Sequence, residues 1–102
     1  MRLYADEEVL LDALHSWGYE EQIGMVHEEL GELLTAINQW KRKRIDSDKL
    51  ISEIADAHIM IAQMAIMFGP EKVQDQIDYK IARLKKRLAD YNAPKGPGIS
   101  EV

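Results

Sequence analysis

Residues 53–68 read EIADAHIMIAQMAIMF, a run that is apolar on nearly every face of a helix but begins with Glu53 and Asp56. At about 100° per residue, these two carboxylates lie about 60° apart, on the side that also carries Gln63. Such an apolar helix is expected to be buried nearly all round, where an unpaired charge is costly. The run therefore predicts a core helix with two buried carboxylates that require a partner. The alternative is that both carboxylates lie at the solvated start of the helix.

Helical spacing of apolar residues, together with start and stop signals, predicts four helices and no strand. The predicted helices cover residues 5–17, 20–44, 48–68 and 71–91. Gly18 ends the first, and Asp46 or Ser47 caps the third. Gly69 and Pro70 separate the third helix from the fourth. The predicted fold class is all-α, arranged as a four-helix bundle.

The length of 102 residues predicts a single domain. Residues 1–91 form the predicted helical domain, and residues 92–102, with two of the three prolines, form an extended or disordered tail. A core of this size is only marginally stable alone. We therefore expect the core to be completed by oligomerisation.

The composition excludes several classes of site and partner. The chain has no cysteine, which excludes disulfides, thiolate metal ligands and cysteine nucleophiles and fits a cytoplasmic location. Its 18 acidic and 13 basic residues give a net charge of −5. This balance argues against a partner that is a nucleic-acid polymer, because such partners require a net basic face.

No targeting or membrane-spanning segment is expected. The first nine residues carry three acidic side chains, unlike a signal peptide. The most apolar stretch, residues 54–68, is interrupted by Asp56, His58 and Gln63 and is shorter than the roughly 20 residues that span a bilayer. We expect a soluble protein without a membrane partner.

A second acidic pair is predicted on the preceding helix, where residues 28–32 read EELGE. The core direction of that helix is set by an apolar stripe at three-four spacing. The stripe consists of Ile23, Val26, Leu30, Leu33, Leu34 and Ile37. Glu28 points about 180° away from this stripe, whereas Glu29 and Glu32 flank it, about 60° apart. An ordinary solvated acidic face is the alternative explanation for one such pair.

Two acidic pairs on consecutive helices can converge, because helices joined by a short loop pack antiparallel. Convergence requires an offset between the two helices, since the first pair lies further from the loop than the second. The resulting repulsion among four carboxylates can be offset only by cations. Ligands that are all oxygen favour Mg²⁺ or Mn²⁺, and neither pair has the Glu-x-x-His spacing of di-iron bundles.

The fourth predicted helix supplies positive charge beside its own apolar stripe. Lys80, Arg83 and Arg87 lie within about 60° of one another. Lys and Arg are common phosphate partners, and Mg²⁺ held by few carboxylates recruits substrate phosphates. These three residues therefore predict a substrate that is a phosphate ester or anhydride. The alternative explanation is that they form an ordinary solvated basic face.

Two glycines, Gly24 and Gly31, lie seven residues apart within the second predicted helix, on the side away from its stripe. Each costs about 1 kcal/mol relative to alanine inside a helix. Close approach of another helix, from residues 5–17 or from another subunit, would explain both.

The acidic residues form a recognisable pattern: Glu28-Glu29-x-x-Glu32, twenty further residues, then Glu53-x-x-Asp56. This pattern resembles the EExxE…ExxD signature of the MazG-like, all-α nucleoside triphosphate pyrophosphohydrolases. The similarity extends over residues 17–90. It includes Gln22 before the first motif and a late Lys-x-x-Arg-Leu-x-x-Arg at residues 80–87.

The resemblance implies a Mg²⁺-dependent enzyme that splits a nucleoside triphosphate between its α and β phosphates, releasing a monophosphate and pyrophosphate. It implies metal binding by Glu29, Glu32, Glu53 and Asp56. It also implies that a metal-activated water attacks phosphorus, while the leaving charge is steadied by Lys80, Arg83 or Arg87, with Lys80 counted as catalytic. Candidates for contacting the base are Trp17, Gln22, Met25 and Trp40. Family members are homodimers or homotetramers built on four-helix bundles.

Two classes of function remain open. The first is this pyrophosphohydrolase, in nucleotide-pool house-cleaning or as an enzyme that prefers dUTP or dCTP. The second is a non-catalytic helical interaction or regulatory module with a structural metal site. Pyrophosphate release from a panel of nucleotides separates the two.

Overall fold

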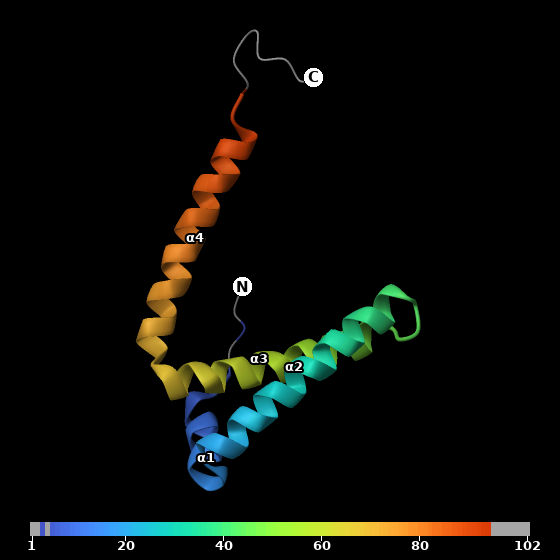
Figure 1. Cartoon of the computed structure of the whole chain (residues 1–102), viewed down its shortest axis with the longest axis vertical. Helices are drawn as coiled ribbons and strands as arrows, with labels where there is room; N and C mark the ends of the chain where they lie inside the picture. Colours follow the sequence, from blue (N-terminus) through green and yellow to red (C-terminus); the bar gives the residue numbers. More distant parts are fainter. Residues whose placement is uncertain (1–2, 4, 95–102) are drawn as a thin grey trace. The chain divides into compact units, whose positions relative to one another are not determined.

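The computed structural model describes residue 3 and residues 5–94. The described chain is entirely α-helical apart from its turns and ends, with no strand. The helices are α1 (Glu7–Trp17), α2 (Tyr19–Lys41), α3 (Ser47–Phe68) and α4 (Pro70–Asn92) (Figure 1). The all-α prediction is confirmed. The predicted tail begins at Asn92, which here ends α4, and residues 95–102 of that tail lie outside the described residues.

The chain divides into two compact units, residues 1–70 and residues 71–102. In the first unit, α2 and α3 run side by side in opposite directions from the turn at residues 42–46 (Figure 1). Helix α1 packs against both of them. The second unit contains α4, which we describe by itself.

Local sequence explains where the helices of the first unit begin and end. The Asp6 side chain accepts hydrogen bonds from the backbone N–H groups of Glu8 and Val9, and so caps α1. Asp46 caps α3 by accepting from the backbone N–H of Lys49 at 2.9 Å. These bonds satisfy backbone donors that the first helical turn leaves free. Gly18 makes the corner between α1 and α2 with φ 87° and ψ 161°, a conformation essentially restricted to glycine.

The buried face of α2 differs from the predicted apolar stripe. Three stripe residues are exposed: Ile23, Leu34 and Ile37. The buried residues of α2 are instead Gln22, Val26 and Ala36, a line that passes close to Glu29. The stripe prediction is wrong at these three positions because the apolar surface of α2 is wider than the area that α1 and α3 cover. The side of α2 that faces α3 therefore includes a glutamate.

Helix α3 is buried along one side, and the prediction of burial all round is not met. Its buried residues are Glu53, Ala57 and Gln63. Its exposed large apolar residues are Ile51, Ile54, Ile59, Ile61, Met64 and Phe68. Two neighbouring helices cover only part of the circumference of a third, so the rest of this apolar surface needs another cover.

By length and composition alone, α3 could also cross a membrane, since its 22 residues include a sufficiently apolar window. The prediction from sequence considered only the shorter apolar stretch at residues 54–68. A core helix of a soluble protein has the same length and composition. In this chain α3 packs against α1 and α2.

A buried amide ties α3 to α1. Gln63 is 1% exposed, and its Nε2 donates a hydrogen bond to the backbone carbonyl of Leu10 at 3.1 Å. Its Oε1 is buried and has no hydrogen-bond partner among the described residues. Because burying a polar group without a partner is costly, the bond to Leu10 is the contact that makes this position tolerable.

The glycines within α2 do not mark a close approach of α1. A Cβ built on Gly24 or Gly31 meets no atom within 4 Å in the described chain. The expectation that the helix at residues 5–17 approaches these glycines is therefore wrong. Approach by another subunit stays a prediction.

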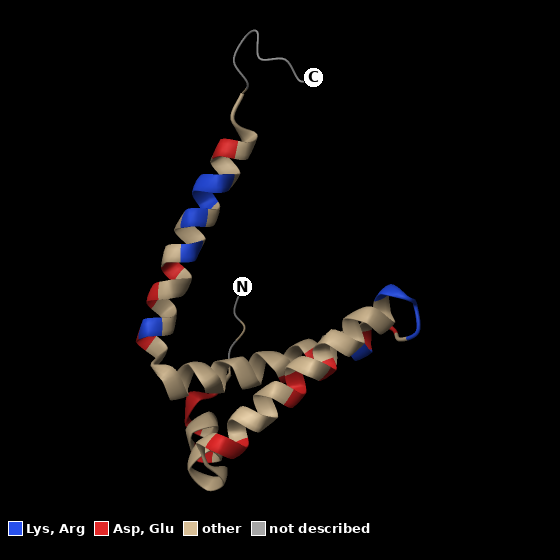
Figure 2. Cartoon of the chain, viewed as in Figure 1, with Lys and Arg blue, Asp and Glu red and all other residues tan. Residues whose placement is uncertain are grey.

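Helix α4 has a clear segregation of charge along its length. Figure 2 shows acidic residues mainly in its first half and basic residues mainly in its second half. Lys80, close to the middle of α4, and Arg83 and Arg87 in its second half are exposed. Arg83 lies over the ring of Tyr79, 5.9 Å from its centroid, and Lys86 Nζ lies 3.5 Å from Asp90 Oδ2. These contacts are internal to the helix.

Substitution by alanine is expected to have opposite effects on stability at Gly18 and at Gly24. We expect Gly18→Ala to destabilise the protein by about 1–3 kcal/mol, because alanine is strained at φ 87°. We expect Gly24→Ala to stabilise it by up to about 1 kcal/mol, because the position is helical with open space around it. Denaturant unfolding measures both. Equal effects at the two sites would contradict the conformational explanation.

Candidate metal centre

Helices α2 and α3 bring together the carboxylates of Glu29, Glu53 and Asp56. One oxygen from each residue can be chosen so that all three lie within 4.8 Å of one another. Glu29 comes from the first predicted pair, and the other two residues form the second pair. The structure thus places the two pairs close together across the α2–α3 contact.

The convergence requires an offset of about one to two helical turns. Glu29 lies 12 residues before the end of α2 at Lys41, which is about 18 Å along the helix axis. Asp56 and Glu53 lie nine and six residues after the start of α3 at Ser47, which is about 14 Å and about 9 Å. A shift of one helix along the other by this amount brings the carboxylates to similar levels.

Two of these carboxylates have a buried oxygen without a partner. Glu53 is only 8% exposed, and its Oε1 lies 3.0 Å from Lys49 Nζ. Its Oε2 is buried without a hydrogen-bond partner among the described residues, as is Oε2 of Glu29. Buried polar oxygens normally have partners, and a cation would supply one to both. Asp56 is exposed, so the cluster is accessible from solvent.

The charges at the site raise two pKa values. Burial, followed by the negative charges of Glu32, Asp56 and Glu53, raises the pKa of Glu29 above its ordinary value of 4.5. The hydrogen bond and charge of Glu53 raise the pKa of Lys49. These shifts show that the metal-free site is crowded with negative charge, part of which Lys49 neutralises.

A groove leads away from the cluster along α2. Residues that line it include Glu28, Glu32, Thr35, Gln39, Lys49 and Glu53. Gly31 also borders this groove, where its missing side chain leaves space. Glu28 is exposed, as its predicted direction required, and it also lines this groove. Glu32, the fourth predicted ligand, is exposed at the groove and close enough to raise the pKa of Glu29.

The donor atoms suit a hard cation. All the ligand atoms in the cluster are carboxylate oxygens, which bind Mg²⁺, Mn²⁺ or Ca²⁺ in preference to softer metals. His58 does not join them: its Nε2 lies 2.9 Å from the backbone carbonyl oxygen of Leu3. The residues present therefore fit a divalent cation, while its identity stays a prediction.

The predicted base-contacting residues are spread along the whole of α2. Trp17 is 65% exposed and precedes α2, whereas Trp40 is 45% exposed near its other end. The 23 residues of α2 span about 33 Å, so one base cannot contact both tryptophans of the same chain. Gln22 is buried, and Met25 is half-buried.

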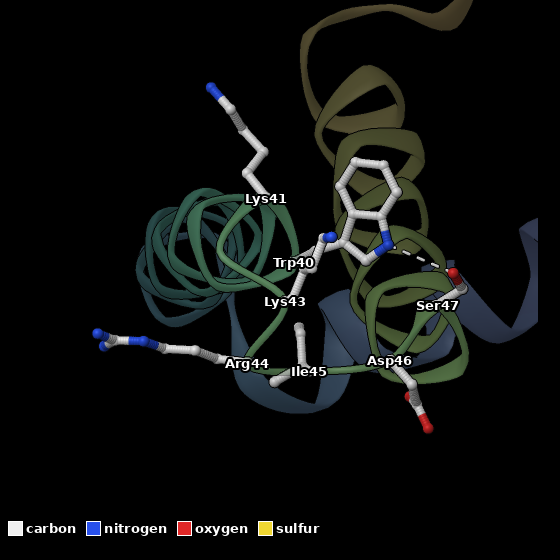
Figure 3. A pocket seen from close by; sticks show the side chains of 7 residues that line it. All are labelled: Trp40, Lys41, Lys43, Arg44, Ile45, Asp46 and Ser47. Carbon is white, nitrogen blue, oxygen red and sulfur yellow. Dashed lines mark hydrogen bonds between the residues drawn. The ribbon is translucent and has the colours of Figure 1, made fainter.

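Trp40 forms part of a hollow at the turn between α2 and α3 (Figure 3). Its Nε1 donates a hydrogen bond to Ser47 Oγ at 3.3 Å, which links the two helix ends. The turn is basic, and Figure 3 shows the side chains of Lys41 and Arg44 pointing away from the indole. These two cations are therefore available to solvent.

One cation at the site was missed in the sequence. Lys49 lies one helical turn before Glu53, and its Nζ contacts that carboxylate. The i, i+4 spacing of a lysine and a glutamate is the signal that could have identified it. The predicted phosphate-binding residues Lys80, Arg83 and Arg87 all lie on α4, in the other unit.

The resemblance to MazG-like enzymes rests on the motif residues alone. Comparisons with protein-family models, with curated proteins and with solved structures give no match. The cluster of Glu29, Glu53 and Asp56 stands independently of that resemblance, because it follows from the packing of α2 against α3.

The cluster predicts that Mg²⁺ or Mn²⁺ stabilises the fold. At a free cation concentration 100 times the Kd, the gain in unfolding free energy is about 2.7 kcal/mol. Glu53→Gln removes a charged ligand and should abolish most of this gain. Asp12→Asn, which alters an exposed carboxylate on α1, should keep it. Thermal or denaturant unfolding with and without the cation measures the effect, and an equal gain in the Glu53→Gln variant would refute the assignment.

The raised pKa of Glu29 predicts a pH-dependent penalty in the metal-free protein. A carboxyl whose pKa is raised on folding contributes stability below its unfolded pKa, near 4.5, and loses it as pH rises through its folded pKa. Glu29→Gln should therefore gain stability over the wild type at pH 7, with the difference shrinking towards pH 4.5. Unfolding in chelator across this range tests the prediction. A difference that does not change with pH would contradict it.

Proposed function

We propose that the protein is a Mg²⁺-dependent nucleoside triphosphate pyrophosphohydrolase, cleaving a (d)NTP to the monophosphate and pyrophosphate. The observation that carries this proposal is the carboxylate cluster, in which Glu29 and Glu53 each present a buried oxygen without a partner. The resemblance of the EExxE…ExxD pattern to that of MazG-like enzymes is the reason for proposing this particular activity. The proposed role is nucleotide-pool house-cleaning in the cytoplasm.

The proposed ligands are Glu29, Glu53 and Asp56, with Glu32 as a fourth at the groove. Bound Mg²⁺ would neutralise phosphate charge and make water a better nucleophile at neutral pH. A site with few carboxylates leaves coordination positions for water and phosphate oxygens. The exposure of Asp56 and Glu32 leaves the cluster open to a substrate from the groove side.

The groove suggests how a nucleotide would lie relative to the carboxylate cluster. Its lining residues on α2 run from Glu28 to Gln39, which precedes Trp40 in the sequence, and Trp40 itself lines the separate hollow at the α2–α3 turn. Trp40 lies about 12 Å from Glu32 along the helix axis. We therefore favour Trp40 over Trp17 as the contact for the base, with Thr35 and Gln39 as hydrogen-bonding groups between the base and the metal.

Self-association is part of the proposal. The exposed apolar residues of α2 and α3 need a cover that α1 does not provide. A homodimer or homotetramer would bury them. Lys80, Arg83 and Arg87 on α4 are proposed as phosphate-binding residues.

A non-catalytic interaction module is the second candidate, and the same exposed apolar surface favours it. In that case the carboxylate cluster would hold a structural cation. Metal-dependent stability is expected in both cases, whereas turnover of a nucleotide is expected only of the enzyme.

The experiment is a panel of canonical and modified (d)NTPs, including dUTP and dCTP, assayed with Mg²⁺ for pyrophosphate release. We expect release from at least one nucleotide. Glu53→Gln should lower the rate by about 100-fold or more, since changes even to groups supporting metal ligands cost 10–100-fold. Asp12→Asn should retain the wild-type rate. No release with any nucleotide, or release unaffected by Glu53→Gln, would reject the enzymatic function.

A further inference from the structure

Lys49 occupies the position of a cation at the carboxylate cluster. Its Nζ lies 3.0 Å from Glu53 Oε1, while Glu53 Oε2 is buried without a partner among the described residues. The side chain of Glu53 is only 10% exposed, whereas that of Lys49 is 59% exposed. The carboxylate is thus held in place, and the lysine is the partner with freedom to move.

A divalent cation and Lys49 compete for Glu53. Mg²⁺ lies about 2.1 Å from its oxygen ligands. An ion on Glu53 Oε1 would therefore lie within roughly 5 Å of an ammonium that stays 3.0 Å from that oxygen, and an ion on Oε2 would lie somewhat further away. Like charges at this separation repel strongly in a partly buried site. Because the Lys49 side chain is 59% exposed, it can relieve this conflict by moving away from Glu53.

The groove offers Lys49 a second position. Lys49, Glu32 and Glu53 all line it, so an ammonium that leaves Glu53 remains beside the space where a ligand of the metal would lie. Mg²⁺ with few protein ligands takes phosphate oxygens as additional ligands, and an ammonium binds such oxygens as a compact charge.

We propose that Lys49 is a metal-displaced phosphate-binding residue: it neutralises Glu53 in the metal-free protein and binds a substrate phosphate once a cation has taken that carboxylate. This proposal rests on the proposed function for the identity of the substrate as a phosphate anhydride. The competition between Lys49 and the cation depends only on the carboxylate cluster. The same lysine would therefore weaken binding of the free metal and strengthen binding of the metal–phosphate complex.

The first arm of the test measures Mn²⁺ alone. Binding of Mn²⁺ to Lys49→Gln, followed by electron paramagnetic resonance of the free ion, should be about three- to tenfold tighter than to the wild type, because the competing positive charge is gone. Lys86→Gln is the matched control, because Lys86 forms an i, i+4 pair with Asp90 on α4 and should leave Mn²⁺ affinity unchanged. An unchanged affinity in Lys49→Gln would overturn the competition.

The second arm measures inorganic pyrophosphate by calorimetry at saturating Mg²⁺. Lys49→Gln should weaken its binding about tenfold, while Lys49→Arg, which keeps the charge, should retain most of it. Tighter Mn²⁺ binding with unchanged pyrophosphate binding would overturn the phosphate-binding role. Lys49 is exposed, so both variants should fold, and thermal unfolding in chelator verifies this.

The two arms separate this inference from the proposed function. If no nucleotide releases pyrophosphate, the enzymatic proposal fails, but both binding measurements can still be made with Mn²⁺ and pyrophosphate. If nucleotides are hydrolysed and Lys49→Gln binds Mn²⁺ and pyrophosphate like the wild type, the enzymatic proposal stands and Lys49 has no role in it.

Discussion

The packing of α2 against α3 through a partly polar face is the constraint on which the site depends. The buried line of α2 passes through Gln22 and close to Glu29, and the facing side of α3 buries Glu53. Carboxylates are therefore held inside a helix contact, where burial and then their mutual charges raise the pKa of Glu29 and two oxygens have no partner among the described residues. The exposed apolar residues of α2, Ile23, Leu34 and Ile37, lie outside this contact.

Much of the fold is readable from the sequence because its signals are local. The Asp46 cap and the Gly18 corner depend on neighbouring residues only, and both lie where the sequence predicted a helix start and a helix end. The spacing of the two acidic pairs allows them to converge only if the two helices are offset. The structure brings together Glu29, Glu53 and Asp56 but not Glu32, and that outcome depends on how α2 packs against α3.

The features that the sequence did not predict depend on which neighbouring helices cover each helix. The periodicity of apolar residues does not contain that information. The exposed stripe residues Ile23 and Leu34 satisfy every rule for a core position. Lys49 was missed for a related reason: an i, i+4 lysine is ordinary on a helix surface, and only the burial of Glu53 makes this pair part of a site. The groove that Lys49 and Glu53 share with one face of α2 likewise follows from the packed helices.

The turn at residues 42–46 has a consequence for how this chain can vary. Surface loops generally tolerate insertions and deletions. Here the turn, fastened by the hydrogen bond from Trp40 to Ser47, sets the height at which α3 starts beside α2. Only residues 42–46 connect the two helices, so adding or removing one residue would change the level at which α3 starts unless the turn or a helix end rearranged. The length of this turn therefore influences how the carboxylates of α2 and α3 meet, and within the turn Asp46 is also required as the cap of α3.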